Sequence, residues 1–315
     1  MQLDRAGRGP RLTPIIRRLT APVRVAVRGR DGVGRTTVAA ALAGAGVTVS
    51  KEPADVDVLV IAETLKPEDR EVLAGAKRPA VVVLNKADLT GFGADGPVAL
   101  AHRRAAQIRA LTGLPTVPMI ALLADVELSD DLFGALRTLV TEPADLTSTD
   151  GFVQSPHPLS TESRAHLLAA LDRFGIAHAV LAIDRGMSAA ALPAHLRRLS
   201  ELDRVVEHVQ AAGAPLRYRR LRSVMTELCA VAAQFDATDL AELLASDDSV
   251  LAMMTAAVDV VEAAGLAVDR GDDSAAHLRR AVHWRRYGRG PVDALHRACS
   301  ADISRGSLRL LARSR

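Results

Sequence analysis

The sequence predicts an α/β domain, built on a reduced parallel sheet with helices on both faces, followed by an α-helical bundle domain. Two observations carry this prediction. Over the first 145 residues, short apolar runs alternate with helical stretches, which is typical of βαβ units. After about residue 160, apolar residues recur instead at steps of three and four, the period of amphipathic helices. A chain of 315 residues is long enough for two domains.

The strands of the first domain are predicted from runs of β-branched and aliphatic residues. The runs 57–62 (DVLVIA) and 80–84 (AVVVL) are almost wholly apolar, as expected for strands buried on both faces of a sheet. Ser129 is suited to cap a helix that runs to about Val140. The remaining expected strands are 23–27, a very short one at 47–49, and 116–122, and the remaining expected helices are 36–42 and 98–111.

The second domain is predicted to consist of long amphipathic helices. Gly213–Pro215 is expected to separate the first two of them, which would then form an antiparallel hairpin. Cys229 is expected to be a small core residue, and Trp284 to anchor the last helices on the bundle. The apolar stripes are Leu196, Leu199, Leu202, Val206 and Val209; Leu221, Val224, Leu228, Val231 and Phe235; and Leu251, Met254, Val258 and Val261.

Composition and charge give the domain limits and the excluded classes. We expect a basic arm at 1–20, the α/β domain at 21–145, a Ser/Thr/Gly/Pro-rich linker at 146–160 and the bundle at 161–315. The net charge is only +3, but residues 279–315 hold ten arginines against two aspartates. An aromatic content of 3% argues against base-stacking nucleic-acid binders, and two cysteines exclude a disulfide scaffold. With no apolar run of about 18 residues and no secretory signal, a cytoplasmic location is expected.

A glycine-rich stretch directly after the first strand carries the first chemical motif. In Walker A loops such glycines let the backbone wrap phosphate groups at a helix start. Thr36 stands where a magnesium ligand belongs, but Arg35 replaces the usual lysine, and arginine is larger and planar. Arg35 therefore either holds a phosphate, fills the pocket or pairs with Asp31. The pattern runs from Gly29 to Thr37, and its expected phosphate-binding residues are Gly29, Asp31, Gly32, Val33, Gly34, Arg35, Thr36 and Thr37.

A second motif, Asn85-Lys86-Ala87-Asp88, follows the strand 80–84. Ligands of parallel sheets bind at the carboxyl ends of the strands, so these residues are placed to meet one. The Asp88 carboxylate is suited to accept from the two ring donors of guanine, Asn85 to bond its other edge, and Lys86 to lie along the ring. Together with the Walker A pattern, this motif predicts a guanine-nucleotide site.

These motifs resemble the G domain of translation-factor-like GTPases, most closely actinobacterial dynamin-like and Era-like GTPases. The stretch 55–89 (DVDVLVIAETLKPEDREVLAGAKRPAVVVLNKADL) is similar to the strand, helix and guanine-specificity strand of that family. Where the family has a Ser-Ala pair supporting the base, Ile120-Ala121-Leu122 stands here, which adds Ala121 and Leu122 to the implied site. Residues 192–233 resemble, in pattern, the helical region of dynamin-like proteins. The resemblance implies GTP or GDP as ligand, with Mg²⁺ at Thr36.

The chain departs from the family after the Walker A helix. Only 20 residues lie between Thr36 and Asp57, too few for two further strands and both switch segments, and no Asp-x-x-Gly occurs there. Because phosphoryl transfer depends on positioning and charge neutralisation, this loss predicts slow or absent GTP hydrolysis, and no catalytic residue is assigned.

The resemblance implies a pseudo-GTPase that is the non-hydrolytic partner of an intact dynamin-like GTPase in a membrane-associated assembly. The Arg-rich helices would then touch the anionic inner face of the plasma membrane, and no nucleic acid is bound. Two alternatives stay open: an active but slow GTPase or ATPase that uses Arg35, and a nucleotide-free structural adaptor in which Arg35 makes an internal ion pair.

Overall fold

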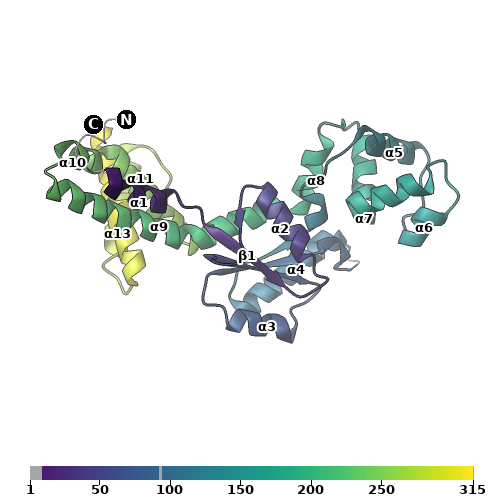
Figure 1. Ribbon diagram of the computed structural model, residues 1–315, viewed down its shortest axis with the longest axis horizontal. Coiled ribbons are helices and arrows are strands. Elements are labelled where there is room, and N and C mark those ends of the chain that lie inside the picture. Colours follow the sequence, from purple (N-terminus) through teal and green to yellow (C-terminus); the bar gives the residue numbers. More distant parts are fainter. Residues whose placement is uncertain (1–8, 92–93, 315) are drawn as a thin grey trace. The chain divides into compact units, whose positions relative to one another are not determined.

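The computed structural model describes residues 9–91 and 94–314, and the chain divides into two compact units (Figure 1). One unit comprises residues 24–209, and the other comprises residues 9–23 and 210–314. Part of the expected basic arm, residues 1–8, lies outside the described residues, whereas Gly9–Thr20 form helix α1. Each unit is described by itself below.

Five parallel strands form the sheet of the first unit, in the order β2-β1-β3-β4-β5. The central strands β3 (Val56–Ala62) and β4 (Ala80–Asn85) are buried along almost their whole length, which explains their unbroken apolar sequences. Strand β1 (Arg24–Gly29) pairs with β3, while β2 (Thr48–Val49) and β5 (Thr116–Met119) form the edges. The expectation of a parallel sheet in an α/β domain is confirmed.

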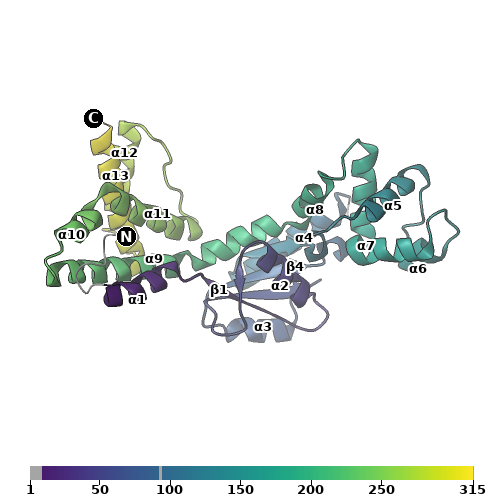
Figure 2. The same cartoon turned by 45° about the horizontal axis from the view of Figure 1, so that its top comes forward.

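Helices cover both faces of this sheet. Helix α2 (Arg35–Gly44) links β1 to β2. Helices α3 (Pro67–Ala74) and α4 (Gly96–Thr112) link β3 to β4 and β4 to β5, which is the opposite direction across the sheet. Because such crossovers are right-handed, α2 lies on one face and α3 and α4 on the other. Figures 1 and 2 show α2 and α3 on opposite sides of the strands. The connection from β2 to β3, residues 50–55, contains no helix.

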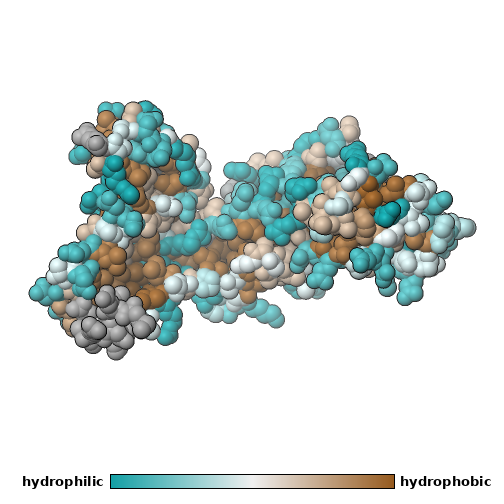
Figure 3. All heavy atoms as spheres, turned by 90° about the horizontal axis from the view of Figure 1, so that it is seen from above, coloured by the Kyte–Doolittle hydropathy of each residue, from teal (hydrophilic) through white to brown (hydrophobic). Residues whose placement is uncertain are grey.

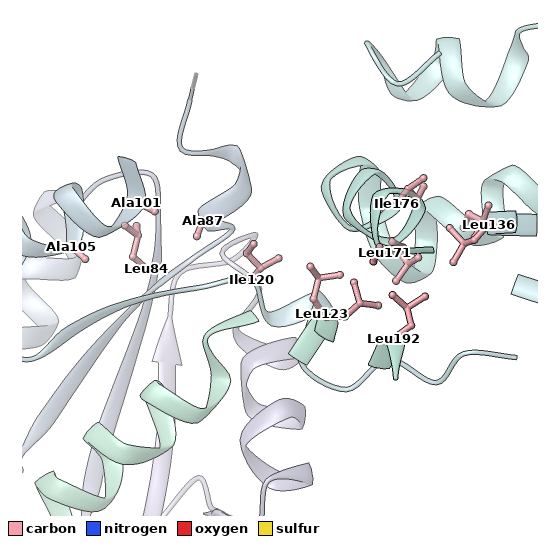
Figure 4. Packing of buried hydrophobic residues seen from close by; sticks show 14 of the residues in the cluster. Leu84, Ala87, Ala101, Ala105, Ile120, Leu123, Leu136, Leu171, Ile176 and Leu192 are labelled. Carbon is pink, nitrogen blue, oxygen red and sulfur yellow. The ribbon is translucent and has the colours of Figure 1, made fainter. Parts of the chain in front are cut away.

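The same unit continues into a set of helices that share its core. These are the short turns η1 (Ala87–Leu89) and η2 (Ala121–Leu123) and the helices α5 (Asp130–Thr141), α6 (Thr149–Gln154), α7 (Thr161–Asp184) and α8 (Leu192–Ser200). In Figure 4, Ile120 and Leu123 lie between Leu84 of the sheet and Leu171 and Leu192 of the helices. Residues 146–160, expected as a linker, contain α6, and its Phe152 is fully buried in this core.

Helix α7 is irregular at its middle. Asp172 has φ 53° and ψ 175°, which is not helical, so two helical segments meet there. By length and composition alone, α7 is the one helix among the described residues that could cross a membrane, with a mean hydropathy of 1.4 over its most apolar window. Its Leu167, Leu171 and Ile176 side chains are buried in the core of the unit, and 33% of that apolar window is buried.

The second unit is entirely helical. It contains α1, most of α9 (Leu202–Gln234), α10 (Thr238–Ala245), α11 (Asp247–Ala263), α12 (Ser274–Tyr287) and α13 (Ala294–Arg313). Trp284 and Tyr218 are fully buried beside Ile303, so the expected anchoring role of Trp284 is confirmed. Figure 3 shows hydrophilic and hydrophobic residues interspersed over the visible surface of both units.

Two expectations about this unit are wrong. Gly213–Pro215 does not separate two helices, since α9 runs unbroken through Pro215. A proline inside a helix costs about 3 kcal/mol, so tertiary contacts must offset it. The neighbouring Gly213 is buried against Val23, and Arg217 donates a hydrogen bond from Nη2 to the carbonyl of Gln210 at 3.0 Å. Cys229, expected in the core, is exposed, because the buried stripe of α9 runs through Val224 and Val231 instead.

Candidate functional site

The expected phosphate loop lies between the end of β1 and the start of α2, as the sequence predicted. Two of its glycines are required by the geometry. A Cβ on Gly29 would lie 2.5 Å from the carbonyl oxygen of Val60. Gly34 has φ +83°, in the left-handed region, and a Cβ there would lie 2.3 Å from Nδ2 of Asn85. The loop is therefore packed against two other segments of the sheet and held in one conformation.

The start of α2 is open to a ligand. Gly34 is the N-cap and supplies no side-chain hydrogen bond to the first turn of the helix. The backbone N–H groups of a first helical turn have no partner within the helix, and together with the helix dipole they favour an anion. Thr36 and Thr37 are both exposed in this turn. The loop thus offers amides and hydroxyls at the place where the sequence predicted phosphate binding.

Arg35, in place of the Walker A lysine, contacts its own loop. Its Nη1 donates a hydrogen bond to the carbonyl of Gly29 at 2.9 Å, and its Nη2 lies 3.5 Å from the Asp31 carboxylate. Asp31 is fully exposed and nearly half of the Arg35 side chain is exposed, so this ion pair is weak. Of the three outcomes expected for Arg35, the structure shows the pairing with Asp31, in a position from which the guanidinium is still accessible.

Asn85 connects three segments of the predicted site. Its side chain is buried; Nδ2 donates to the carbonyl of Val33 at 2.9 Å, and Oδ1 accepts from the backbone N–H of Ala121 at 3.0 Å. The residues Val33, Asn85 and Ala121 come from β1–α2, β4–η1 and β5–η2, so the structure brings these three predicted segments together. Both polar groups of the Asn85 amide are used within the protein.

The other residues of the predicted base-binding site differ in how far they are exposed. Lys86 is exposed in the left-handed region, with φ 58°, and Leu122 is also exposed. Asp88 is half-buried in η1. Burial raises the pKa of the Asp88 carboxyl, the nearby charge of Asp172 in α7 raises it further, and Lys86 lowers it. The fold therefore disfavours the ionised carboxylate that guanine recognition would need.

A cavity of about 910 Å³ adjoins the phosphate loop and is lined by its residues Gly29, Arg30, Arg35 and Thr36. The β2–β3 connection and the start of α3 form its remaining walls, and Asn85, Lys86 and Asp88 take no part in its lining. It is lined by Ala26, Val27, Arg28, Gly29, Arg30, Arg35, Thr36, Ala39, Val49, Ser50, Lys51, Glu52, Leu59, Glu68, Asp69 and Val72.

Sequence analysis missed a buried ion pair in the wall of this cavity. Asp69 is 1% exposed; its Oδ1 accepts from Arg30 Nε at 3.0 Å and its Oδ2 from the backbone N–H of Lys66 at 3.0 Å. The hydrogen bond to Asp69 raises the pKa of Arg30. The only sequence signal was the placement of Asp69 in the first turn after Pro67, which identifies a helix start but gives no indication of Arg30.

A second network, also missed, closes the cavity at the β2–β3 connection. Arg78 donates from Nη1 to Glu52 Oε2 at 2.9 Å and from Nη2 to Oε1 at 3.0 Å, which lowers the pKa of Glu52 to about 2. Arg28 donates to Glu52 at 2.8 Å and to the buried Asp57 at 3.0 Å. These arginines are therefore already paired with carboxylates.

The residues present fit a magnesium ion poorly. Among the described residues, no group of three or more His, Cys, Asp or Glu side chains is arranged to hold a metal. Of the three carboxylates that line the cavity, those of Asp69 and Glu52 accept hydrogen bonds on both oxygens. Among the described lining residues, the side-chain oxygen ligands that remain are the exposed Glu68 carboxylate and the hydroxyls of Thr36 and Ser50.

Comparisons with known proteins were made at three levels. No family model, no curated protein and no solved structure matches this chain. An inference about its function therefore rests on the chemistry of the site.

Proposed function

We propose that this chain is a degenerate G-domain protein that binds the phosphates of a guanine nucleotide weakly at Gly29–Thr37 and hydrolyses it slowly or not at all. The observation that carries the proposal is the arrangement around Asn85, which ties the glycine loop to the Ala121 segment at the carboxyl edge of the sheet. In a sheet of order 2-1-3-4-5, ligands bind at this edge, where the chain leaves β1 and β3 in opposite directions.

The proposal of weak catalysis is supported by the short path from α2 to β3. After Gly44 the chain forms only the two-residue β2 and the loop 50–55 before β3 begins. No room is left there for segments that would contact a terminal phosphate and position water, and the Arg35 guanidinium is shared with Gly29 and Asp31.

In this proposal the chain acts as the non-hydrolytic partner of an intact dynamin-like GTPase. The sequence segments 1–23 and 210–315, which include its all-helical unit, carry 20 of the 40 basic residues, and this unit would contact the partner or an anionic membrane surface. Affinity capture from the native host tests this: recovery of an intact dynamin-like GTPase is expected, and its repeated absence argues against the partnership. Sedimentation with vesicles, with and without phosphatidylserine, tests the membrane contact.

A nucleotide-free structural adaptor is the second candidate, and a specific observation favours it. Arg35 pairs within its own loop, and both polar groups of the Asn85 amide bond to backbone atoms. Both features would stabilise the loop without any ligand. In such an adaptor the glycines would serve only the turn and its packing.

Thermal unfolding with added nucleotide separates the candidates. A ligand that binds only the folded state raises the melting temperature, by an amount that grows with the ratio of its concentration to its dissociation constant. We expect millimolar GDP and GTP to raise it and ATP to have a smaller effect, with the guanine preference lost in Asp88→Asn. A shift by ATP alone indicates the slow ATPase, and no shift by any nucleotide indicates the adaptor. A robust GTPase rate that Thr36→Ala abolishes would contradict the proposed lack of catalysis.

A further inference from the structure

The cavity beside the phosphate loop is lined by four cationic residues. They differ in how fully their positive charges are paired with carboxylates. Arg28 is bonded to two carboxylates, those of Glu52 and Asp57. Arg30 pairs with the buried Asp69 through Nε, Arg35 pairs with the exposed Asp31, and Lys51 is exposed on the β2–β3 connection. Arg30 and Arg35 belong to the loop itself and flank the same cavity as Thr36.

Arg30 is held at one end and free at the other. Its Nε donates to the buried Asp69, which also accepts from Lys66 N–H and so is fixed at the start of α3. Among the described residues, neither Nη1 nor Nη2 of Arg30 has a hydrogen-bond partner. A guanidinium fixed through Nε is pre-organised to bind an oxyanion with its two terminal nitrogens. The Asp69 contact therefore orients Arg30 without using its terminal donors.

Arg35 supplies a second guanidinium at the same cavity. Its contacts to the Gly29 carbonyl and the exposed Asp31 are of the kind that an incoming phosphate replaces at low cost, because Asp31 is fully solvated. The carboxylates that would hold a metal there, Asp69 and Glu52, are occupied by protein donors. The site therefore offers two guanidinium groups, while two of its three carboxylates are not free to bind a metal.

We propose that this site binds the terminal phosphates of its ligand through Arg30 and Arg35 together, and does so without Mg²⁺. The ligand class is a polyphosphate anion, and its identification as a guanine nucleotide rests on the proposed function. The two guanidinium groups replace the lysine and the metal ion with two fixed, always-charged groups. Binding is then independent of chelators and strongly dependent on ionic strength.

Calorimetric titration of the full chain tests this, with GTP, GDP and inorganic tripolyphosphate as probes, each in EDTA and in MgCl₂ at constant ionic strength. The expected affinity in EDTA is within about twofold of that in MgCl₂. Arg35→Ala and Arg30→Ala are each expected to weaken binding by about 10- to 100-fold, the effect of losing one charge-assisted contact. Arg70→Ala, which removes the same charge from an exposed position of α3 outside this cavity, is the matched control and is expected to change binding less than twofold.

Arg30→Ala leaves Asp69 buried without its partner and so threatens the fold. The double variant Arg30→Ala, Asp69→Asn removes both charges and keeps an amide oxygen to accept from Lys66 N–H. Circular dichroism confirms its folding before titration. A folded double variant that binds the probes as tightly as the wild type would overturn the role of Arg30.

The outcomes separate this inference from the proposed function. Tripolyphosphate binding in EDTA that both arginine variants weaken supports the two-arginine site, even if no nucleotide binds and the guanine assignment fails. Nucleotide binding that requires Mg²⁺ overturns the two-arginine site and leaves the proposed function standing. If no probe binds under either condition, both are overturned.

Discussion

The two halves of the predicted site differ in what their polar groups contact. Around Asn85, every polar atom of the amide is buried and bonded to backbone of a neighbouring segment. Around Arg35 and Thr36, the side chains are exposed and border a cavity, and Arg35 pairs with a fully solvated carboxylate. The half of the motif set around Asn85 therefore stabilises the fold, whereas the half around Arg35 and Thr36 remains accessible to a ligand.

The sharpest test of this contrast is a pair of glycine variants. Gly34→Ala is expected to destabilise the protein by about 4 kcal/mol, because the left-handed conformation costs about 1–2 kcal/mol and the new Cβ displaces the buried Asn85 amide. Gly32 has nearly the same φ, +80°, but a Cβ added there would meet only open space, so Gly32→Ala should cost only the conformational part. Urea unfolding measures both. Equal losses would show that the Asn85 contact contributes nothing.

Asn85→Ala tests the buried half directly. It leaves the Val33 carbonyl and the Ala121 N–H without partners, and two such buried groups are expected to cost about 3 kcal/mol together. The adjacent Lys86→Ala, at an exposed position with no such contacts, is the control and is expected to change stability by less than about 0.5 kcal/mol. A loss for Asn85→Ala no larger than that of the control would break the comparison.

Asp88→Asn examines a residue whose charge the fold disfavours. Because the folded-state pKa of Asp88 is raised above its ordinary 3.8, its ionisation reduces stability as pH rises past that value. Asp88→Asn is therefore expected to raise the melting temperature at pH 7, and the gain should shrink as the pH falls and vanish well below 3.8, where the carboxyl is protonated in both states. A melting temperature lowered at pH 7 would mean instead that the carboxylate makes a favourable contact.

The smallest effect on stability is expected for Arg35→Ala. Its partner Asp31 is fully exposed and its own side chain is nearly half exposed, so the free energy of unfolding should change by less than about 0.5 kcal/mol. The same variant is expected to lose polyphosphate binding. If urea unfolding instead shows a loss comparable to that of Asn85→Ala, Arg35 belongs to the structural half of the site, and the adaptor becomes the better account.

Much of the first unit could be predicted from local sequence. The runs at 57–62 and 80–84 are strands because continuous apolar sequence suits a strand buried on both faces, and the glycine loop lies between β1 and α2 as expected. The closeness of the loop and Asn85 was also expected, because carboxyl ends of parallel strands share one edge of a sheet, whereas Ala121 was expected there only from the family resemblance.

Other features could not be predicted because they depend on contacts between distant segments. A proline ordinarily ends a helix, yet α9 continues through Pro215. The neighbouring Gly213 is buried there against Val23, a contact between distant segments. Residues 146–160 have the composition of a linker, yet Phe152 is fully buried among residues far along the chain. The Arg30–Asp69 pair joins residues 39 positions apart, with no local pattern to reveal it.

Local sequence was enough to predict the parallel sheet, the position of its glycine loop and the helical character of the remainder, because hydrophobic period and glycine placement act over a few residues. Which motif residues stay accessible depends instead on tertiary packing. A polar side chain that packing buries must find partners within the protein, as Asn85 and Asp69 do, whereas one left at a cavity, as Arg35 is, keeps its donors accessible. Burial depends on segments that meet only in the folded chain. For this reason no local sequence pattern could have distinguished the buried polar residues from the accessible ones.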